Sequence, residues 1–332
     1  MTFARTLASA ATFALVAGAG QAQDANPAVI FDLGGKFDRS FNQASYEGAE
    51  RFKEETGIGY RDFELQNDAQ REQALRRFAQ RGHDPVITAG FSYASAMETV
   101  AAEFPDTRFV IVDAVVDLPN VRSVVFNEHE GSYLVGLLAA MASENDKIGF
   151  VGGMDIPLIR KFACGYVQGA KATKPEIEVY QNMTGNTGQA WNDPRGGEIA
   201  KSQIDRGADV VYHAAGGTGI FVLQAAADAD VLGIGVDSNQ NMLHPGQVLT
   251  SMVKRVDNAV YDAMMDVQNG EWTTGLEVMG LSEEGVGYAV DENNADLISE
   301  EMAMAAEEAK QQIISGEIEV HDYTSDGSCP VS

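Results

Sequence analysis

The sequence contains few cysteines and histidines, and it lacks the motifs that mark metal sites and hydrolases. There are two cysteines and five histidines in 332 residues. The histidines are scattered without the spacing of metal ligands; they are His83, His129, His213, His244 and His321. No Gly-x-Ser-x-Gly motif occurs. We therefore expect no metal, no cofactor and no catalytic residues, so the chain is not expected to be an enzyme.

Basic residues are also scarce. The chain has 23 Lys and Arg against 49 Asp and Glu, which gives a formal net charge of −26. Such an excess of carboxylates repels the phosphates of nucleic acids and anionic membrane surfaces. Nucleic acid and lipid bilayers are therefore not expected as partners.

Long apolar runs are absent beyond the start of the chain. Residues 1–23 carry Arg5 as their only charge, followed by a largely apolar run over 7–17 and small residues over 18–22. This pattern predicts a cleaved signal peptide. The alternative is an N-terminal membrane anchor, but the apolar run is shorter than the roughly 20 residues that a spanning helix needs.

The two cysteines, Cys164 and Cys329, belong to a chain that is expected to enter an oxidising compartment, where disulfides persist. One interpretation is a bridge that fixes the C-terminal tail to the helix carrying Cys164. The other is a pair of unpaired thiols. We favour the bridge.

Strand-length apolar runs alternate with helical patterns along most of the chain, which predicts an α/β fold with parallel, doubly wound sheets. The pattern restarts near residue 130, and more than 300 residues exceed what one core usually supports, so two lobes are expected. The expected strands span 28–32, 60–65, 85–88, 108–113, 122–126, 148–151, 178–181, 209–213 and 232–236. The last long helix is expected over 294–315.

A candidate ligand-binding corner lies in the segment 32–48, where a glycine turn joins the first strand to a helix. In open α/β sheets, ligands bind outside the carboxyl ends of the strands. Asp32, Phe41 and Asn42 are therefore expected to face one crevice.

From this segment onward the sequence resembles the basic membrane protein (BMP), or purine nucleoside receptor, family of ABC transporter substrate-binding proteins. The resemblance runs from about Val29 to Asp257 and keeps the family's order of motifs. Its further motifs are Gly90-Phe91, Val112-Asp113, the segments 148–154, 162–169, 216–221 and 235–240, and Thr250-Ser-Met-Val-Lys-Arg255.

The resemblance implies a type I periplasmic binding protein fold, in which two lobes are joined by a hinge of three crossings. The N-terminal lobe is expected over 28–126 plus about 255–285. The C-terminal lobe is expected over 128–252 plus about 290–330. The crossings are expected at 126–128, at 252–254 and near 286–291.

The resemblance also implies residue roles that the sequence alone leaves open. Phe41 and Phe221 match the rings that sandwich a purine, although a lone Phe at a helix start is more often part of a core. Asp237 and Lys254 match the residues that hold the sugar, although Asp237 could simply cap a turn. The predicted ligand-binding residues are Asp32, Phe41, Asn42, Phe91, Asp113, Gly217, Phe221, Asp237 and Lys254.

The predicted function is that of a monomeric periplasmic protein that captures a purine nucleoside or free purine between its lobes and presents it to an ABC transporter permease. Many members of the family are lipoproteins tethered through a cysteine. Because no cysteine lies near the expected cleavage region, we expect this chain to carry no direct membrane anchor and not to be a lipoprotein.

Two other functions compete with this one. The first is a sensor of the same fold that docks on a receptor, and the second is a nucleoside-processing enzyme. A dinucleotide enzyme is disfavoured, because Gly217-Thr-Gly219 lacks the third glycine of the Rossmann fingerprint, where Val222 stands.

Overall fold

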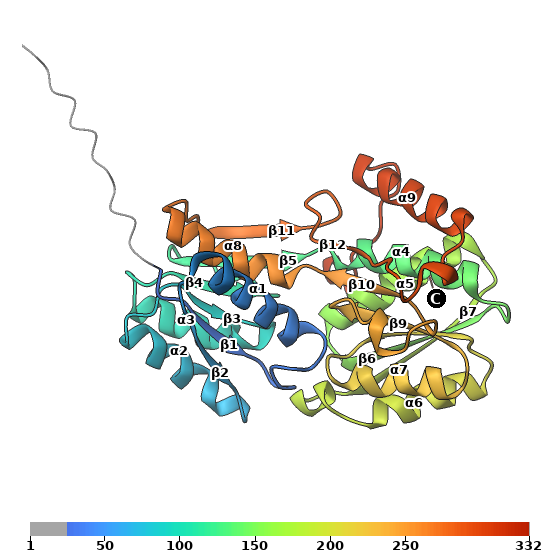
Figure 1. Cartoon of the computed structure of the whole chain (residues 1–332), viewed down its shortest axis with the longest axis horizontal. Coiled ribbons are helices and arrows are strands. Elements are labelled where there is room, and N and C mark those ends of the chain that lie inside the picture. The colour runs from blue at the N-terminus through green and yellow to red at the C-terminus, as the bar shows by residue number, and fades with distance from the viewer. Residues whose placement is uncertain (1–24, 332) are drawn as a thin grey trace, which may run out of the picture.

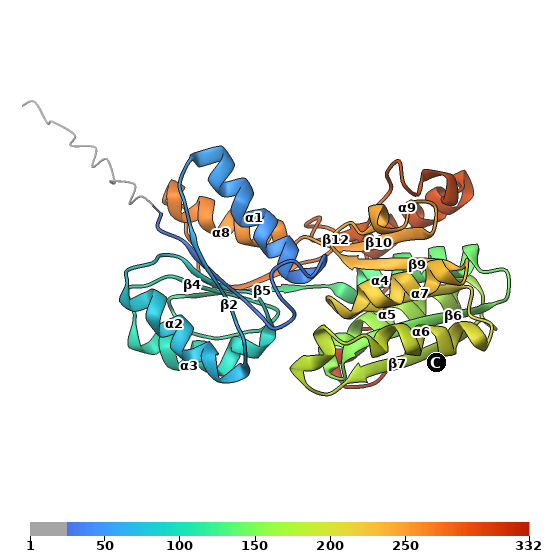
Figure 2. The same cartoon turned by 60° about the horizontal axis from the view of Figure 1, so that its bottom comes forward.

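The structure, a computed structural model, describes residues 25–331. The predicted signal peptide, residues 1–23, lies outside the described residues. The chain forms two six-stranded sheets that lie end to end, each covered by helices on both faces (Figures 1 and 2).

The first sheet has the strand order β11-β5-β4-β3-β1-β2, and all of its neighbouring strands are parallel. Its central strands β1 and β4 are completely buried, as expected for apolar strands covered on both faces. The strands are β1 (Ala28–Phe31), β2 (Arg61–Glu64), β3 (Val86–Thr88), β4 (Phe109–Val112), β5 (Val121–Phe126) and β11 (Gly275–Met279).

Helices cover the first sheet in two pairs. The helices α1 (Phe41–Thr56) and α8 (Val256–Asn269) pack together on one face. The helices α2 (Arg71–Gln80) and α3 (Ala94–Glu103) pack on the other.

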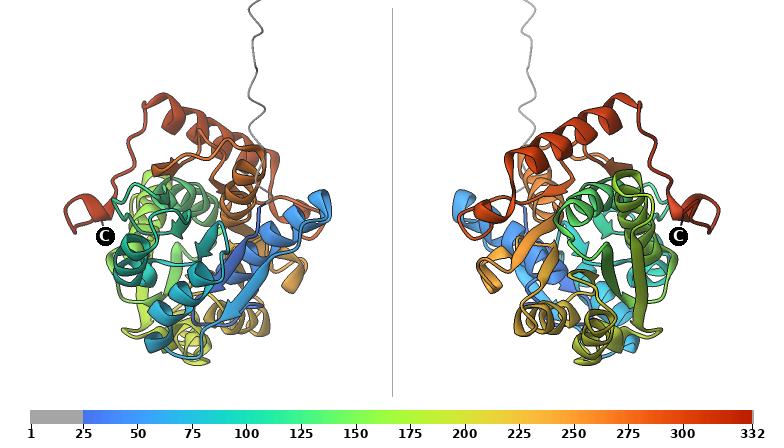
Figure 3. Two further views of the ribbon diagram at one scale, coloured as in Figure 1. Left: turned by 90° about the vertical axis from the view of Figure 1, so that its left-hand side faces the viewer. Right: turned by 90° about the vertical axis from the view of Figure 1, so that its right-hand side faces the viewer.

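The second sheet has the order β12-β10-β9-β8-β6-β7, and only the pair β10–β12 is antiparallel. Its strands are β6 (Lys147–Met154), β7 (Glu178–Gly185), β8 (Val210–Ala214), β9 (Leu232–Asp237), β10 (Val248–Lys254) and β12 (Val286–Tyr288). The helices α4 (Glu128–Ala142) and α5 (Pro157–Thr173) cover one face, and α6 (Arg195–Asp205) and α7 (Thr218–Asp228) cover the other. Helix α9 (Glu300–Ser315) packs against α4 from outside, as the end-on views show (Figure 3).

The chain passes between the two lobes three times, from β5 to α4, from β10 to α8 and from β11 to β12. These crossings are hydrogen-bonded to one another: the Asn127 N–H donates to the Met279 carbonyl at 3.1 Å, and the Arg255 N–H donates to the Gly285 carbonyl at 2.8 Å. The predicted fold class, two doubly wound lobes joined by a three-crossing hinge, is confirmed.

The final helix begins six residues later than the sequence pattern predicts. The Ser299 side chain accepts a hydrogen bond from the Met302 N–H and caps the helix there, and Ile298 before it is extended. Because an N-cap residue satisfies free N–H groups of the first turn, it fixes the start of the helix. The apolar residues before Ser299 belong to a short 3₁₀ turn, Ala295–Leu297.

Helices α4 and α5 approach so closely that their backbones touch at glycines. A methyl carbon at Gly136 would lie 2.1 Å from the carbonyl oxygen of Tyr166, and one at Gly169 would lie 2.0 Å from that of Tyr133. The chain around these glycines is buried in the main core. Only residues without a side chain fit at these two positions. The glycines therefore allow the close packing of α4 against α5 on this face of the second sheet.

We predict that Gly136→Ala lowers the midpoint of thermal unfolding, measured by circular dichroism, because the added methyl must push α5 away from α4. Overpacking of this kind costs about 1–3 kcal/mol. Gly59→Ala is the matched control, since a methyl there has open space. Equal midpoints for the two variants would contradict the close packing.

Candidate functional site

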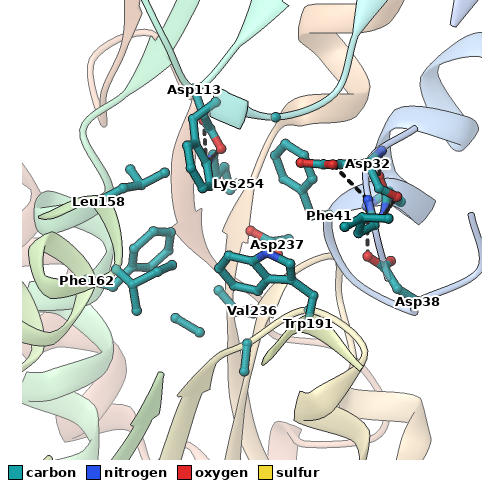
Figure 4. Close-up of a pocket in the computed structure, with 18 residues that line it drawn as sticks. Asp32, Asp38, Phe41, Asp113, Leu158, Phe162, Trp191, Val236, Asp237 and Lys254 are labelled. Carbon is teal, nitrogen blue, oxygen red and sulfur yellow. Dashed lines mark hydrogen bonds and ion pairs between the residues drawn. The ribbon is translucent and has the colours of Figure 1, made fainter. Parts of the chain in front are cut away.

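The candidate site is a cleft between the two lobes, at the carboxyl ends of strands from both sheets. The space between its lining residues amounts to about 580 Å³, part of which is continuous with bulk solvent. Figure 4 shows carboxylates and aromatic rings from both lobes around one space. The cleft is lined by Asp32, Leu33, Asp38, Phe41, Asn42, Gly90, Phe91, Asp113, Leu158, Ile159, Phe162, Trp191, Ala214, Ala215, Gly216, Val236, Asp237 and Lys254.

Two aspartates mark corresponding positions in the two lobes. Asp113 follows β4 and Asp237 ends β9, and both have a left-handed backbone, with φ of 68° and 63°. Asp tolerates this conformation better than most residues, and such strained positions cluster at functional sites. Burial raises the pKa of each carboxyl to about 6. Each lobe thus ends a strand with a buried aspartate that lines the cleft.

Lys254, the last residue of β10, is 1% exposed and lies between these carboxylates. Its Nζ is 2.7 Å from the Asp113 carboxylate and 2.9 Å from the Glu128 carboxylate. Burial alone would lower the pKa of Lys254, but Asp113, Glu128 and Asp237 together outweigh it and raise the pKa. The ammonium therefore stays charged and joins the first lobe to the hinge.

The carboxamide of Asn42 is used within its own lobe. Its oxygen accepts the Asp32 N–H at 3.1 Å, and its nitrogen donates to the carbonyls of Asp32 and Gly35 at 3.3 and 3.2 Å. The role of Asn42 as a ligand-binding residue stays a prediction. Asn42 lines the cleft, but its polar atoms hold the turn between β1 and α1.

Asp32 is similarly occupied. Its carboxylate is 2.6 Å from Arg71 and accepts the Leu33 N–H and the Ser92 hydroxyl. Because both carboxylate oxygens already have partners, Asp32 has less capacity for a ligand than its position suggested.

The predicted pair of rings, Phe41 and Phe221, is not brought together. Phe41 lines the cleft at the start of α1, but Phe221 is 38% exposed, and its backbone and Cβ lie against Gly197 of α6. Phe221 is not among the residues that line the cleft. Gly217 is likewise not among the lining residues, whereas its neighbour Gly216 is.

Two other rings from the second lobe take the place expected for Phe221. Trp191 ends the 3₁₀ turn Gly188–Trp191 after β7, and Phe162 lies on α5. Trp191 packs on Gly153, where a methyl carbon would lie 2.4 Å from the indole ring. The sequence analysis missed both. A signal was available for Trp191, which follows a strand in a Gly-rich loop at the ligand-binding edge.

Asp38 is a further lining residue that the sequence analysis missed. Its carboxylate accepts hydrogen bonds from the N–H groups of Ser40, Asn42 and Gln43 at 2.8–3.1 Å. Asp38 therefore caps the N-terminus of α1. Burial raises its pKa to about 6 in spite of these hydrogen bonds. An Asp shortly before a helix start is a recognisable cap signal.

The lobes touch across the cleft through the segment before α1. The Ser40 hydroxyl donates to the Asp237 carboxylate at 2.5 Å, the Ser238 hydroxyl donates to the Ser40 carbonyl at 2.9 Å, and the Gln240 side chain donates to the Arg39 carbonyl at 2.9 Å. The structure is therefore that of a closed cleft. Asp237 is at the centre of the contact.

The structure joins Cys164 of α5 to Cys329 in a disulfide. In residues 25–331, no group of three or more His, Cys, Asp or Glu side chains is arranged to hold a metal ion. Within the same residues, none of the helices has the length and apolar character that a membrane span requires.

Comparisons with known proteins agree with this architecture. The family model for PnrA-like ABC transporter substrate-binding proteins (Bmp) matches residues 25–324. A protein of Lactococcus lactis named "ABC transporter nucleoside-binding protein BmpA" is 35% identical over 320 residues, covering 90% of this chain and 89% of the relative.

Solved structures of solute-binding proteins also resemble this chain. A solute-binding protein of an ABC transporter system from Aeropyrum pernix superposes with a TM-score of 0.83 at 30% identity, covering 90% of this chain and 93% of that chain. A solute-binding protein from Conexibacter woesei, at 24% identity, has a TM-score of 0.73, covers 90% of this chain and 99% of that chain, and shows the fold alone.

The comparisons correct the predicted localisation. Three relatives from Pyrococcus abyssi, P. horikoshii and P. furiosus, each 34% identical, are named "uncharacterized lipoprotein". They contradict the prediction of a periplasmic protein that is not a lipoprotein. That prediction rested on the absence of cysteine from a segment outside the described residues, and the folded lobes are independent of how such a segment is anchored.

The family resemblance found in the sequence is confirmed. The matched residues span nearly all of the described chain, and the aligned relatives cover 90% of the chain. The chain belongs to the family of PnrA-like (Bmp) ABC transporter substrate-binding proteins.

Proposed function

We propose that the cleft binds a purine nucleoside or free purine and that the closed, ligand-bound protein delivers it to an ABC transporter permease. The observation that carries this proposal is the combination of aromatic rings and buried carboxylates from both lobes around one cleft. The name of the Lactococcus relative supports a nucleoside as the ligand class.

The rings supply the surface for the base. Among the described residues, the aromatic pairs of the structure do not include Phe41, Phe91, Phe162 or Trp191. The Lys254 ammonium lies over the rings of Phe41 and Phe162, 5.2 and 5.6 Å from their centroids. Stacking of a base on one ring contributes about 1–3 kcal/mol. We assign Phe41 and Trp191, one from each lobe, as the rings nearest the base.

The carboxylates and Lys254 supply the polar contacts. A carboxylate can accept hydrogen bonds from two vicinal hydroxyls, and Asp237 has capacity beyond its one bond from Ser40. Lys254 has a third N–H beyond its contacts with Asp113 and Glu128. We therefore assign the ribose to Asp237 and Lys254, with Asp113 and Asp38 beside the base.

Closure follows from ligand contact with both lobes. Only a ligand that touches both lobes stabilises the closed state over an open one. The contact between Ser40 and Asp237 closes the same edge of the cleft, so a bound ligand and this contact act together. A transporter can then distinguish the loaded protein from the empty one.

We predict that Phe41→Ala weakens guanosine binding by about ten- to hundredfold, because one stacking surface is lost. Isothermal titration calorimetry of ligand-stripped protein measures it. Phe221→Ala is the matched control, since that ring lies outside the cleft. A comparable loss in Phe221→Ala would support the pair Phe41 and Phe221 predicted from the sequence and contradict the assignment of Trp191.

We predict that guanosine binds at least about a hundredfold more tightly than guanosine monophosphate. The lining carries four carboxylates, and Lys254 is the one basic side chain among the lining residues of the described chain. Like charges brought together out of water cost several kcal/mol. Competition of the monophosphate against bound guanosine measures the difference, and equal affinities would contradict the charge assignment.

We predict that Asp237→Asn raises the unfolding temperature of the ligand-free protein at pH 7.5 while it weakens guanosine binding. The pKa of Asp237 is raised from 3.8 to about 6, so the folded state binds the proton more tightly than the unfolded state. Asp237 therefore stabilises the fold below about pH 4, and that contribution is lost as the pH rises through 6.

Thermal melts at pH 5 and pH 7.5 measure this effect. The wild type should lose more stability than Asp237→Asn between the two values. An identical pH dependence in both proteins would show that the Asp237 carboxyl does not titrate in this range.

A further inference from the structure

The C-terminal segment beyond α9, residues 316–331, is fixed to the outer side of α5; we call it the C-terminal clasp. The disulfide between Cys329 and Cys164 holds its end. The Gln168 side chain holds its middle, donating to the His321 carbonyl at 3.0 Å and accepting the His321 N–H at 2.8 Å. Figures 1 and 3 show the chain end on this flank of the second lobe.

Asp322 in the clasp is the outermost member of a row of charges that reaches the cleft. Its Oδ2 lies 3.5 Å from the Nζ of Lys161, a residue of α5 whose side chain is 8% exposed. Lys161 is 3.0 Å from the Glu128 carboxylate and donates to the Phe126 carbonyl at 2.7 Å. Glu128 in turn holds Lys254.

The row therefore alternates in sign from the surface to the ligand site, in the order Asp322, Lys161, Glu128, Lys254 and Asp113. The attraction of Lys254 and Lys161 outweighs the effect of burial and lowers the pKa of Glu128, so its charge persists. His129 lies beside the row, but burial lowers its pKa to about 4, so it is neutral at pH 7.5.

Removal of the Asp322 charge changes the ion pairs among Lys161, Glu128 and Lys254. Within the described residues, Asp322 and Glu128 are the carboxylates in ion-pair contact with Lys161. Without Asp322, Lys161 interacts with Glu128 alone and draws it toward α5. Glu128 then holds Lys254 less firmly, and interactions of this kind are strong where water is excluded.

We propose that Asp322 is a positioning residue for the ligand cleft, acting through Lys161 and Glu128 on the ammonium of Lys254. The C-terminal clasp is thus part of the binding apparatus. This inference rests on the proposed function, because it concerns the lysine that we assign to the ribose.

The test is a double-mutant cycle in guanosine affinity at pH 7.5, measured by calorimetry on ligand-stripped full-length protein. Asp322→Asn should weaken binding about three- to tenfold. In a Lys161→Gln background, the same substitution should have no further effect, since its route to the cleft is gone. Asp322→Glu should retain wild-type affinity, because its carboxylate can still reach Lys161.

Asp326→Asn is the matched control. Asp326 lies in the same clasp and contacts His321 and Ser328 rather than Lys161, so its substitution should leave the affinity unchanged. An unchanged affinity in Asp322→Asn, or an equal loss in the Lys161→Gln background, would overturn the inference. Failure of the wild type to bind guanosine or guanine would instead refute the proposed function.

Discussion

The buried ammonium of Lys254 is the group on which the arrangement of the cleft depends. It ends β10, at one of the crossings between the lobes, and contacts Asp113 of the first lobe and Glu128 at the start of α4. A buried charge is stable only when it is paired, and removal of one partner from such a pair costs about 3–5 kcal/mol. The hinge, the cleft and the row of charges behind it are therefore one electrostatic unit.

The cleft keeps charges that a purely structural protein would replace with apolar side chains. Asp38, Asp113 and Asp237 are buried, and burial raises each pKa to about 6. Two of them also have left-handed backbones. Strained backbones and buried carboxyls with shifted pKa values cluster at functional sites, where a ligand can pair with the carboxyls. The backbone geometry and the electrostatics thus agree in supporting this cleft as the proposed binding site.

Much of the fold could be predicted from sequence, because apolar strands alternate with amphipathic helices and the pattern restarts near residue 130. The position of the cleft followed as well, since parallel strands direct their carboxyl ends to one edge. The start of α9 could not be placed, because the cap at Ser299 outweighs the apolar pattern before it.

Side-chain roles were harder to predict than positions. Asn42 and Asp32 do line the cleft, but hydrogen bonds from a turn and from Arg71 occupy them, and these partners are set by three-dimensional contacts. Phe221 follows the predicted glycine turn, yet it is not among the lining residues, and Trp191 from a different loop lines the cleft instead. A sequence motif predicts which loop reaches a site. It predicts less reliably which side-chain atoms of that loop remain available to a ligand.

The most direct test of the central claim is a crystal structure of the protein with guanosine bound. The account predicts a base between Phe41 and Trp191, with ribose hydroxyls on Asp237 and Lys254 and the contact between Ser40 and Asp237 closed. Guanosine bound outside this cleft, or bound within it with its hydroxyls away from Lys254 and Asp237, would contradict the account.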